Sequence, residues 1–176
     1  MYIDHLIKSA QRGNGQDYLT LFQKHEEAVY RIAFIYVKNQ EDALDVVQET
    51  AYRSFKSISK LKDARYFKTW LIKIAISCSI DLLRKRQKML QLQPEYQDLI
   101  QEPSNMDISL TLSLRELIET LDKDEKSVIM LRFYQDFTLR EVKDILGIPL
   151  GTAKTILYRA LRKLRLQVNE EDVYER

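Results

Sequence analysis

The sequence has little of what sheets, disulfides and membrane spans require. Its 176 residues include four glycines and three prolines, few for a sheet protein with many tight turns. Its single cysteine, Cys78, excludes an intramolecular disulfide, and two histidines cannot complete a zinc site around it, so we interpret it as a core residue. No apolar run approaches the ~20 residues that span a bilayer. We therefore expect a cytoplasmic protein without cofactor and without direct membrane insertion.

The residues that are abundant favour helices, and charge is segregated along the chain. Leucine, isoleucine, lysine, glutamate, glutamine and arginine dominate, which predicts an all-α fold. Residues 1–92 carry 16 basic and 10 acidic side chains, residues 93–125 carry 2 and 9, and residues 126–176 carry 10 and 7. Two basic segments around an acidic one suit two surfaces that meet polyanions, joined by a segment that avoids them.

Apolar residues at three- and four-residue steps predict three long helices in the first half of the chain, preceded by a short one. The long helices span residues 17–37, 41–58 and 64–88. The inward faces are expected to be Tyr18, Leu21, Phe22, Val29, Ile32, Ala33 and Tyr36, then Leu44, Val47, Ala51, Phe55 and Ile58, then Phe67, Leu71, Ile74, Ala75, Cys78 and Leu82. Together these helices predict a bundle.

The periodicity fades after residue 91, where two prolines and many polar residues indicate a tether. Helical patterns resume at residues 112–121 and 124–134, each with a capping residue and a glutamate three positions later, namely Ser113 with Glu116 and Asp122 with Glu125. We therefore predict two small helical domains, residues 1–90 and residues 112–170. A flexible acidic linker over residues 91–111 joins them.

A helix-turn-helix pattern follows in the second domain. Thr138 and Glu141 form a capping box at the start of a short helix that ends at Gly147. Pro149 and Gly151 then open another helix. The residues expected to face inward from it are Ala153, Leu157, Ala160, Leu161 and Leu164. A short helix, a glycine turn and a second helix occur in this order in DNA-binding domains.

The outward face of that second helix is polar and basic. It carries Lys154, Thr155, Tyr158, Arg159 and Arg162. Lys154 and Thr155, near the helix N-terminus, are expected to reach base edges in the major groove. Arg159, Arg162 and the upstream Arg132 are expected to contact phosphates. The alternative is that the basic run is only a solvated helix face, but the complete turn pattern before it favours DNA binding.

The third long helix carries a stripe of residues outside its core face. The stripe consists of Tyr66, Trp70, Lys73, Ser77, Asp81, Arg84 and Lys88, and the cluster Arg84, Lys85 and Arg86 adds to its charge. Aromatic rings stack on unpaired bases and basic side chains follow the backbone, so the stripe suits a separated DNA strand. A core position for Trp70 is the alternative that the pattern leaves open.

An acidic patch lies on the second long helix. Asp45, Gln48 and Glu49 share one helical face, and Asp42 lies one turn earlier. Two carboxylates and an amide suit a basic protein partner, and a solvated face is the alternative. Neither a histidine nor a third ligand cluster accompanies them, which argues against acid–base catalysis or a magnesium site.

These motifs resemble those of extracytoplasmic-function (ECF) sigma factors, the promoter-specificity subunits of bacterial RNA polymerase. The strings DALDVVQET at residues 42–50, FKTWLIKIA at residues 67–75 and IDLLRK at residues 80–85 look like region 2 of that family. The segment at residues 138–165, including GIPLGTAKT, looks like region 4. The resemblance covers nearly the whole chain except the connector.

The resemblance implies a division of labour. Asp42, Asp45, Gln48 and Glu49 would contact the β′ clamp helices of core RNA polymerase, and region 4 would meet its β flap. The stripe of Tyr66, Trp70, Lys73, Ser77, Arg84, Lys85 and Lys88 would recognise and melt the −10 element of promoter DNA. The face of Lys154, Thr155, Tyr158, Arg159 and Arg162, with Arg132, would read the −35 element. A membrane-anchored anti-sigma factor would regulate the chain.

Two residues depart from the family pattern. Ser77 stands where many relatives have asparagine, so the −10 base preference does not carry over. Ile156 follows Lys154 and Thr155 where relatives often have arginine, so one DNA contact is missing. The resemblance therefore predicts the function, but it does not predict which promoter sequence is recognised.

Two other classes of function are separable from this one. A stand-alone helix-turn-helix regulator would dimerise and bind a palindrome without polymerase. The sequence shows no additional helix that could form such a dimer. An enzyme acting on nucleic acid would need a metal cluster, a nucleophile with its base, or a phosphate-binding glycine loop. The sequence shows none of these, so we predict a non-enzymatic initiation factor for stress-response genes.

Overall fold

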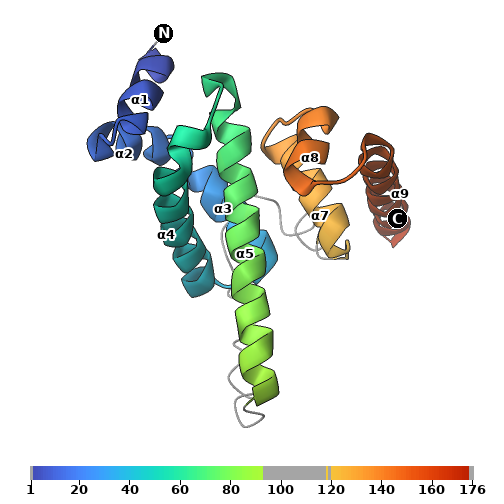
Figure 1. Cartoon of the computed structure of the whole chain (residues 1–176). Coiled ribbons are helices and arrows are strands. Elements are labelled where there is room, and N and C mark those ends of the chain that lie inside the picture. Colours follow the sequence, from blue (N-terminus) through green and yellow to red (C-terminus); the bar gives the residue numbers. More distant parts are fainter. Residues whose placement is uncertain (1, 93–117, 119, 175–176) are drawn as a thin grey trace. The chain divides into compact units, whose positions relative to one another are not determined.

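The computed structural model describes residues 2–92, 118 and 120–174, without the side chains of residues 90–92 and 168–174. These residues form helices and turns and no strand, which confirms the all-α prediction. The chain forms two compact units, Met1–Ser104 and Asn105–Arg176 (Figure 1). Residues 93–117, which hold most of the predicted linker and the helix predicted at 112–121, lie outside the described residues. The domain limits 1–90, 91–111 and 112–170 therefore stay a prediction.

The described residues of the first unit, 2–92, form five α-helices and two short 3₁₀ turns. The elements are α1 (Tyr2–Gln11), α2 (Gly15–Gln23), α3 (Glu26–Val37), α4 (Gln40–Ser57), η1 (Ile58–Lys60), η2 (Ala64–Tyr66) and α5 (Phe67–Leu92). Asn14 caps α2 by accepting hydrogen bonds from the backbone N–H groups of Gln16 and Asp17 at 3.0 and 3.1 Å. Asn39 caps α4 in the same way, accepting from the N–H of Asp42 at 2.9 Å.

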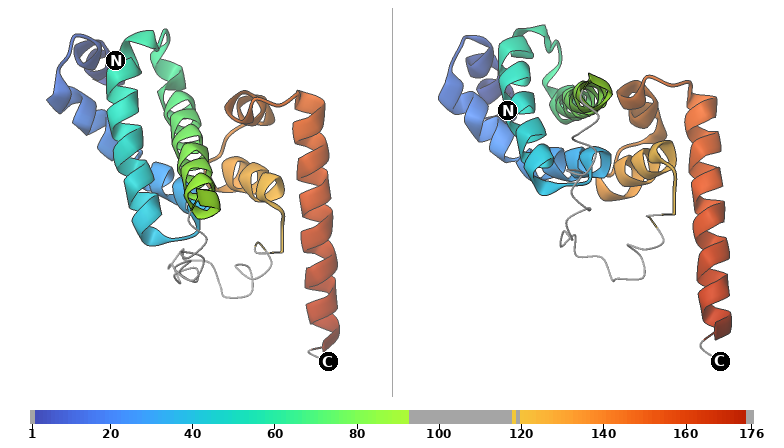
Figure 2. Two further views of the ribbon diagram at one scale, coloured as in Figure 1. Left: turned by 60° about the horizontal axis from the view of Figure 1, so that its bottom comes forward. Right: turned by 90° about the horizontal axis from the view of Figure 1, so that it is seen from below.

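The core of the first unit lies among α3, α4 and α5, which pack side by side (Figure 2). Ile32 of α3, Val46 of α4 and Leu71 of α5 are almost completely buried. α1 and α2 pack on one another and cover one end of this bundle. Between Arg84 and Met89 every side chain of α5 is exposed, so this part of the helix presents its basic residues to solvent.

The helix predicted at residues 17–37 is two helices. α2 ends at Gln23 and α3 begins at Glu26, and His25 between them has a non-helical φ of −122° and ψ of 0°. The apolar spacing continues across this break, which is why periodicity alone did not reveal it. The break lets α2 contact α4 while α3 packs along both α4 and α5.

The buried face of α4 also differs from the predicted one. Leu44 and Phe55, predicted to face inward, are 46% and 36% exposed. Small or polar residues replace them in the core, namely Ala43, Val46, Thr50 and Ser54, whereas Val47 and Ile58 are buried as predicted. The hydroxyl of Ser54 binds the carbonyl of Thr50 and the hydroxyl of Tyr18. Because the Ser54 hydroxyl finds hydrogen-bond partners inside the bundle, a face with little hydrophobic signal can pack inward.

The second unit contains the predicted helix-turn-helix. From residue 120 onward its described elements are α7 (Lys123–Ile129), the π-helical turn η4 (Met130–Tyr134), α8 (Leu139–Leu146) and α9 (Leu150–Tyr174). The capping boxes predicted at Asp122 with Glu125 and at Thr138 with Glu141 are both formed, and the pair Ser113 with Glu116 lies outside the described residues. Gly147 ends α8 with a φ of +67°, a left-handed conformation that glycine adopts without strain.

None of the helices described here is long and apolar enough to cross a membrane.

The orientation of α4 can be tested with two alanine substitutions. Val46→Ala removes buried methyl groups and should lower the free energy of unfolding by about 1–3 kcal/mol. Leu44→Ala, on the exposed side, should lower it by less than about 0.5 kcal/mol. Urea unfolding followed by the fluorescence of Trp70, the single tryptophan, measures both. Equal losses in the two variants would contradict the observed orientation.

Candidate functional site

A groove of about 470 Å³ lies between α4 and α5 of the first unit. Its lining residues are Asp45, Val46, Gln48, Glu49, Tyr52 and Arg53 from α4 and Cys78, Asp81, Leu82 and Lys85 from α5. The helical spacing of Asp45, Gln48 and Glu49 brings all three, as predicted, to one exposed wall of the groove. The first unit therefore has a concave surface with acidic and amide groups on one side.

Arg53 neutralises part of the acidity of this groove. Its Nε lies 2.5 Å from Oε1 of Glu49, and its Nη1 lies 2.7 Å from Oδ2 of Asp81 on the opposite helix. Hydrogen bonds to Asp81 and Glu49 raise the pKa of Arg53. In the described part of the chain Asp45 makes no ion pair, so it is the carboxylate of the groove that is available to a partner.

Asp42 does not belong to this exposed wall. Its side chain is buried, and its Oδ2 accepts a hydrogen bond from Nδ2 of Asn39 at 2.6 Å. Its Oδ1 pairs with Nη2 of Arg86 at 2.5 Å. Both carboxylate oxygens are engaged inside the unit, so we withdraw Asp42 from the predicted polymerase contact. Its structural role is to hold the basic part of α5 against the N-terminus of α4.

Cys78 lines the groove from its buried side. Burial raises the pKa of its thiol. A buried, protonated thiol is unreactive, as expected for the core residue predicted from sequence.

The predicted stripe on α5 lies at the surface of the first unit. Tyr66 is 53% exposed, and Lys73, Ser77, Arg84, Lys85 and Lys88 are exposed as well. Trp70 is half-buried, with its ring centre 6.0 Å from that of Phe67. The position of Trp70 is therefore compatible with both predictions, because one part of the ring packs inward and the rest remains accessible.

Four of the five residues predicted on the exposed face of α9 form no ion pair with any other residue that the structure describes. Lys154, Thr155, Tyr158 and Arg162 are exposed, Tyr158 to 68%, while Ala153, Leu157 and Ala160 face the core. Ile156 is buried among the core residues. Its side chain faces away from the polar surface, so isoleucine in place of the family's arginine removes no side chain from the exposed face of α9.

Arg159 has partners inside the second unit. Its Nε lies 2.6 Å from Oε1 of Glu125, and its Nη2 lies 3.2 Å from Oδ2 of Asp122. Lys163, one turn later, places its Nζ 2.7 Å from Oε2 of Glu125. The predicted phosphate contact of Arg159 therefore competes with a cluster that ties α9 to α7.

Glu125 is the centre of this cluster. Its side chain is completely buried. Burial alone raises its pKa, but hydrogen bonds from Lys163, from the backbone N–H of Asp122 and from Arg159 outweigh burial and lower the pKa to about 2. The capping box explains Glu125 from sequence, but its bonds across to α9 were not foreseen. Arg159 and Lys163, four residues apart, were the available signal.

Arg132, the remaining predicted phosphate contact, lies beside the turn before α8. Its Nη1 is 3.5 Å from the carbonyl oxygen of Phe137, and its guanidinium carbon is 5.7 Å from the centre of the Phe133 ring. The side chain is half-buried. Within the described residues no group of three or more histidine, cysteine or acidic side chains could hold a metal ion.

Comparisons with known proteins match both units. The Sigma-70 region 2 family model matches residues 21–89, and the Sigma-70 region 4 model matches residues 117–166. The chain is 36% identical over 155 residues to the RNA polymerase sigma factor SigV of Bacillus subtilis, covering 88% of this chain and 93% of SigV. The chain belongs to the ECF sigma factors.

A second relative and a solved structure are also similar to this sigma factor over most of its length. The ECF RNA polymerase sigma factor SigW of Bacillus subtilis is 28% identical, with 97% of this chain and 98% of SigW covered. The fold is that of the sigma factor RpoE of Bartonella quintana, solved with the anti-sigma factor NepR. That structure is 21% identical, has a TM-score of 0.73, and covers 88% of this chain and 98% of its own.

The matched segments contain the surfaces described above. The region 2 match includes the α4–α5 groove and the α5 stripe, and the region 4 match includes the helix-turn-helix of this sigma factor. α1, which ends at Gln11, precedes the region 2 match. This RNA polymerase sigma factor thus presents three exposed polar surfaces on two separate units.

The role of Glu125 can be tested by substitution and pH. The stability that ionised Glu125 contributes is complete above its ordinary pKa of 4.5 and is lost as pH falls toward 2. Glu125→Gln should therefore destabilise α7 and α9 at pH 7 by on the order of 2 kcal/mol, and the difference from the wild type should shrink below pH 4.5.

Hydrogen exchange of peptides from α7 and α9 measures this effect. Asp124→Asn removes a neighbouring exposed carboxylate and serves as the matched control, with little change expected at either pH. Equal protection in wild type and Glu125→Gln at pH 7 would show that the cluster contributes nothing.

Proposed function

We propose that this sigma factor binds core RNA polymerase through the α4–α5 groove and directs it to promoters through the α5 stripe and the exposed face of α9. It supplies recognition and strand separation without a catalytic step of its own, and it acts in the cytoplasm. The observation that carries the proposal is the presence of these separate surfaces in a member of the sigma factor family. In this proposal polymerase and −10 contacts lie in residues 1–90, the −35 contact in residues 112–170, and residues 91–111 connect them.

The groove fits a basic helical partner, for which we propose the β′ clamp helices of the polymerase. Asp45 offers an unpaired carboxylate, Gln48 offers an amide, and Glu49 shares its charge with Arg53. Charged groups at the edge of a concave surface favour a partner of opposite charge and fix its orientation. We propose that the second unit makes the additional contact with the β flap.

The α5 stripe fits the separated strand of the −10 element. Tyr66 and the accessible part of Trp70 offer faces on which unpaired bases stack, and each such contact is worth about 1–3 kcal/mol. Lys73 and Ser77 lie between these rings and the C-terminal part of α5, where Arg84, Lys85 and Lys88 are exposed. A strand that lies along this face would stack its bases on the aromatic rings, and its phosphates would then contact the basic side chains.

The exposed face of α9 fits the −35 element as duplex DNA. Lys154 and Thr155 lie in the second turn of the recognition helix, where helix-turn-helix proteins contact base edges. Tyr158 and Arg162 follow on the same side and suit backbone contacts. We assign Arg159 to positioning α9, because Glu125 and Asp122 hold its guanidinium.

We propose that a membrane-anchored anti-sigma factor restrains this chain and that its target promoters serve stress-response genes. The related RpoE of Bartonella quintana was solved in complex with an anti-sigma factor, which supports a partner of that kind. Such a partner would have to cover the groove or a DNA-facing surface to block initiation.

Run-off transcription tests the proposed function. Core polymerase, a set of stress-type promoters and the full chain should give promoter-specific transcripts, and core polymerase alone should give none. If the purified chain instead dimerises and protects a palindromic site without polymerase, the function is that of a stand-alone regulator. Failure to associate with core polymerase in sedimentation would equally reject the proposal.

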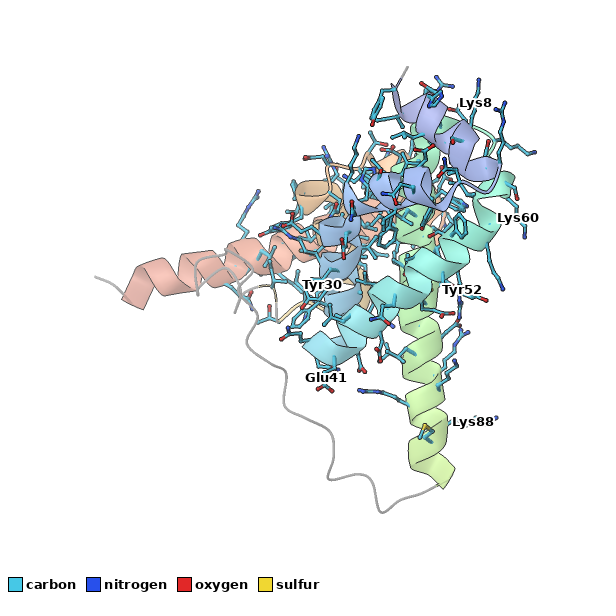
Figure 3. All side chains as sticks on the ribbon, turned by 90° about the vertical axis from the view of Figure 1, so that its left-hand side faces the viewer. Lys8, Tyr30, Glu41, Tyr52, Lys60 and Lys88 are labelled. Carbon is cyan, nitrogen blue, oxygen red and sulfur yellow. The ribbon has the colours of Figure 1, made fainter. Side chains whose placement is uncertain are left out.

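Asp45→Lys tests the groove. Reversal of this unpaired charge should weaken binding to core polymerase at least tenfold, since like charges oppose a basic partner. Fluorescence anisotropy of the labelled chain against core polymerase measures the affinity. Glu41→Lys, an exposed charge reversal at the start of the same helix and outside the groove, is the matched control (Figure 3). Equal affinities for Asp45→Lys and wild type would reject the groove as the contact.

A further inference from the structure

Exposed cations gather where α1 meets the turn that follows α4. The side chain of Gln11, in the last turn of α1, fixes this junction. Its Nε2 donates to the carbonyl oxygens of Ile58 at 3.1 Å and Leu61 at 2.8 Å. Ile58 and Leu61 lie 47 and 50 residues after Gln11 in the sequence, and the Gln11 amide links both of them to α1. This contact places the basic residues of both segments on the same end of the bundle.

We call this surface the basic end, and it consists of Lys8, Arg12, Lys56, Lys60 and Lys62. All five side chains are exposed, and none forms an ion pair with another described residue. The Nζ of Lys56 lies 4.5 Å from the centre of the Tyr52 ring. Figure 3 shows Lys8 and Lys60 at one end of the unit, with Glu41 and Lys88 away from them.

Few carboxylates oppose these cations. Asp63, next to Lys62, is already bound by Arg65, whose Nη2 lies 2.7 Å from Oδ2 of Asp63. Asp4, one turn before Lys8 on α1, interacts chiefly with the chain N-terminus. The basic end therefore keeps a strong positive charge at neutral pH.

The basic end adjoins the aromatic start of the α5 stripe. Only Asp63 separates Lys62 from η2, which ends at Tyr66, and α1 contacts η2. Trp70 lies one turn further along α5. A DNA strand whose bases stack on these rings would leave the stripe over Lys60 and Lys62 and then reach α1. Lysines on flexible stems bind phosphates as point charges without selecting bases.

We infer that the basic end binds the phosphate backbone of the promoter strand beyond the segment that stacks on Tyr66 and Trp70. The inference rests on the proposed function and extends the DNA path onto α1, which lies outside the segment matched to region 2. The basic end adds affinity and salt dependence rather than sequence preference, because its ligands are phosphates.

The test uses the full chain assembled with core polymerase and a promoter fragment whose non-template strand is unpaired from the −10 element onward. Two double variants, Lys60→Gln with Lys62→Gln and Lys8→Gln with Arg12→Gln, remove two cations each. The slope of the logarithm of the binding constant against that of the salt concentration should become shallower by about 1.4 in each, at about 0.7 for each single-strand phosphate contact. Anisotropy over a potassium chloride series measures the slope.

Lys38→Gln is the control, because this exposed residue caps the end of α3 just before α4 begins, whereas the basic end lies where α4 ends. It should leave the slope unchanged, and all variants should keep the wild-type thermal melting temperature. Retained promoter binding with unchanged slopes in both double variants would overturn the inference alone. A wild-type complex that fails to bind the promoter would overturn the proposed function and the inference together.

An anionic membrane is the competing polyanion for the basic end. Sedimentation with vesicles of phosphatidylglycerol and phosphatidylcholine, using the same variants, separates it from DNA. Loss of vesicle binding in the double variants, together with an unchanged salt slope on DNA, would overturn the assignment to nucleic acid.

Discussion

In each unit a buried carboxylate in the first turn of one helix holds an arginine of the helix that we propose to face DNA. Asp42 is the third residue of α4 and binds Arg86 of α5, and Glu125 is the third residue of α7 and binds Arg159 of α9. A buried carboxylate left without its partner is strongly unfavourable, so each pair fixes the position of the basic helix on its neighbour. The free end of α5 and the face of α9 depend on these two contacts.

Ion pairs within the protein divide these basic residues into two groups. Arg53, Arg86, Arg159 and Lys163 are bound by carboxylates of the protein itself. Lys73, Arg84, Lys85, Lys88, Lys154 and Arg162 lie exposed on the surfaces proposed to meet DNA, and the basic end adds five more. An arginine engaged by a buried carboxylate positions a helix, whereas a solvated one is available to phosphates at little cost.

The groove shows how this division affects a protein contact. Asp45, Gln48 and Glu49 share one face by helical spacing, but Arg53 reduces the charge that Glu49 offers. Asp81 of α5 pairs with Nη1 of Arg53, so this ion pair connects the two walls of the groove. The recognition of a basic partner therefore centres on Asp45 and Gln48, a narrower surface than the four residues suggested by the motif.

The sequence by itself determined the helical class, both capping boxes, the glycine that ends α8 and the exposed residues of the α5 and α9 faces, because these follow from local spacing and backbone preference. Only the tertiary structure decided that residues 17–37 bend into two helices, that α4 buries Thr50 and Ser54 rather than Leu44 and Phe55, and that Asp42 and Arg159 have internal partners. The physical reason is that a buried hydrogen bond or ion pair joins residues tens of positions apart. Periodicity along one helix carries no information about which distant side chain will satisfy a polar group.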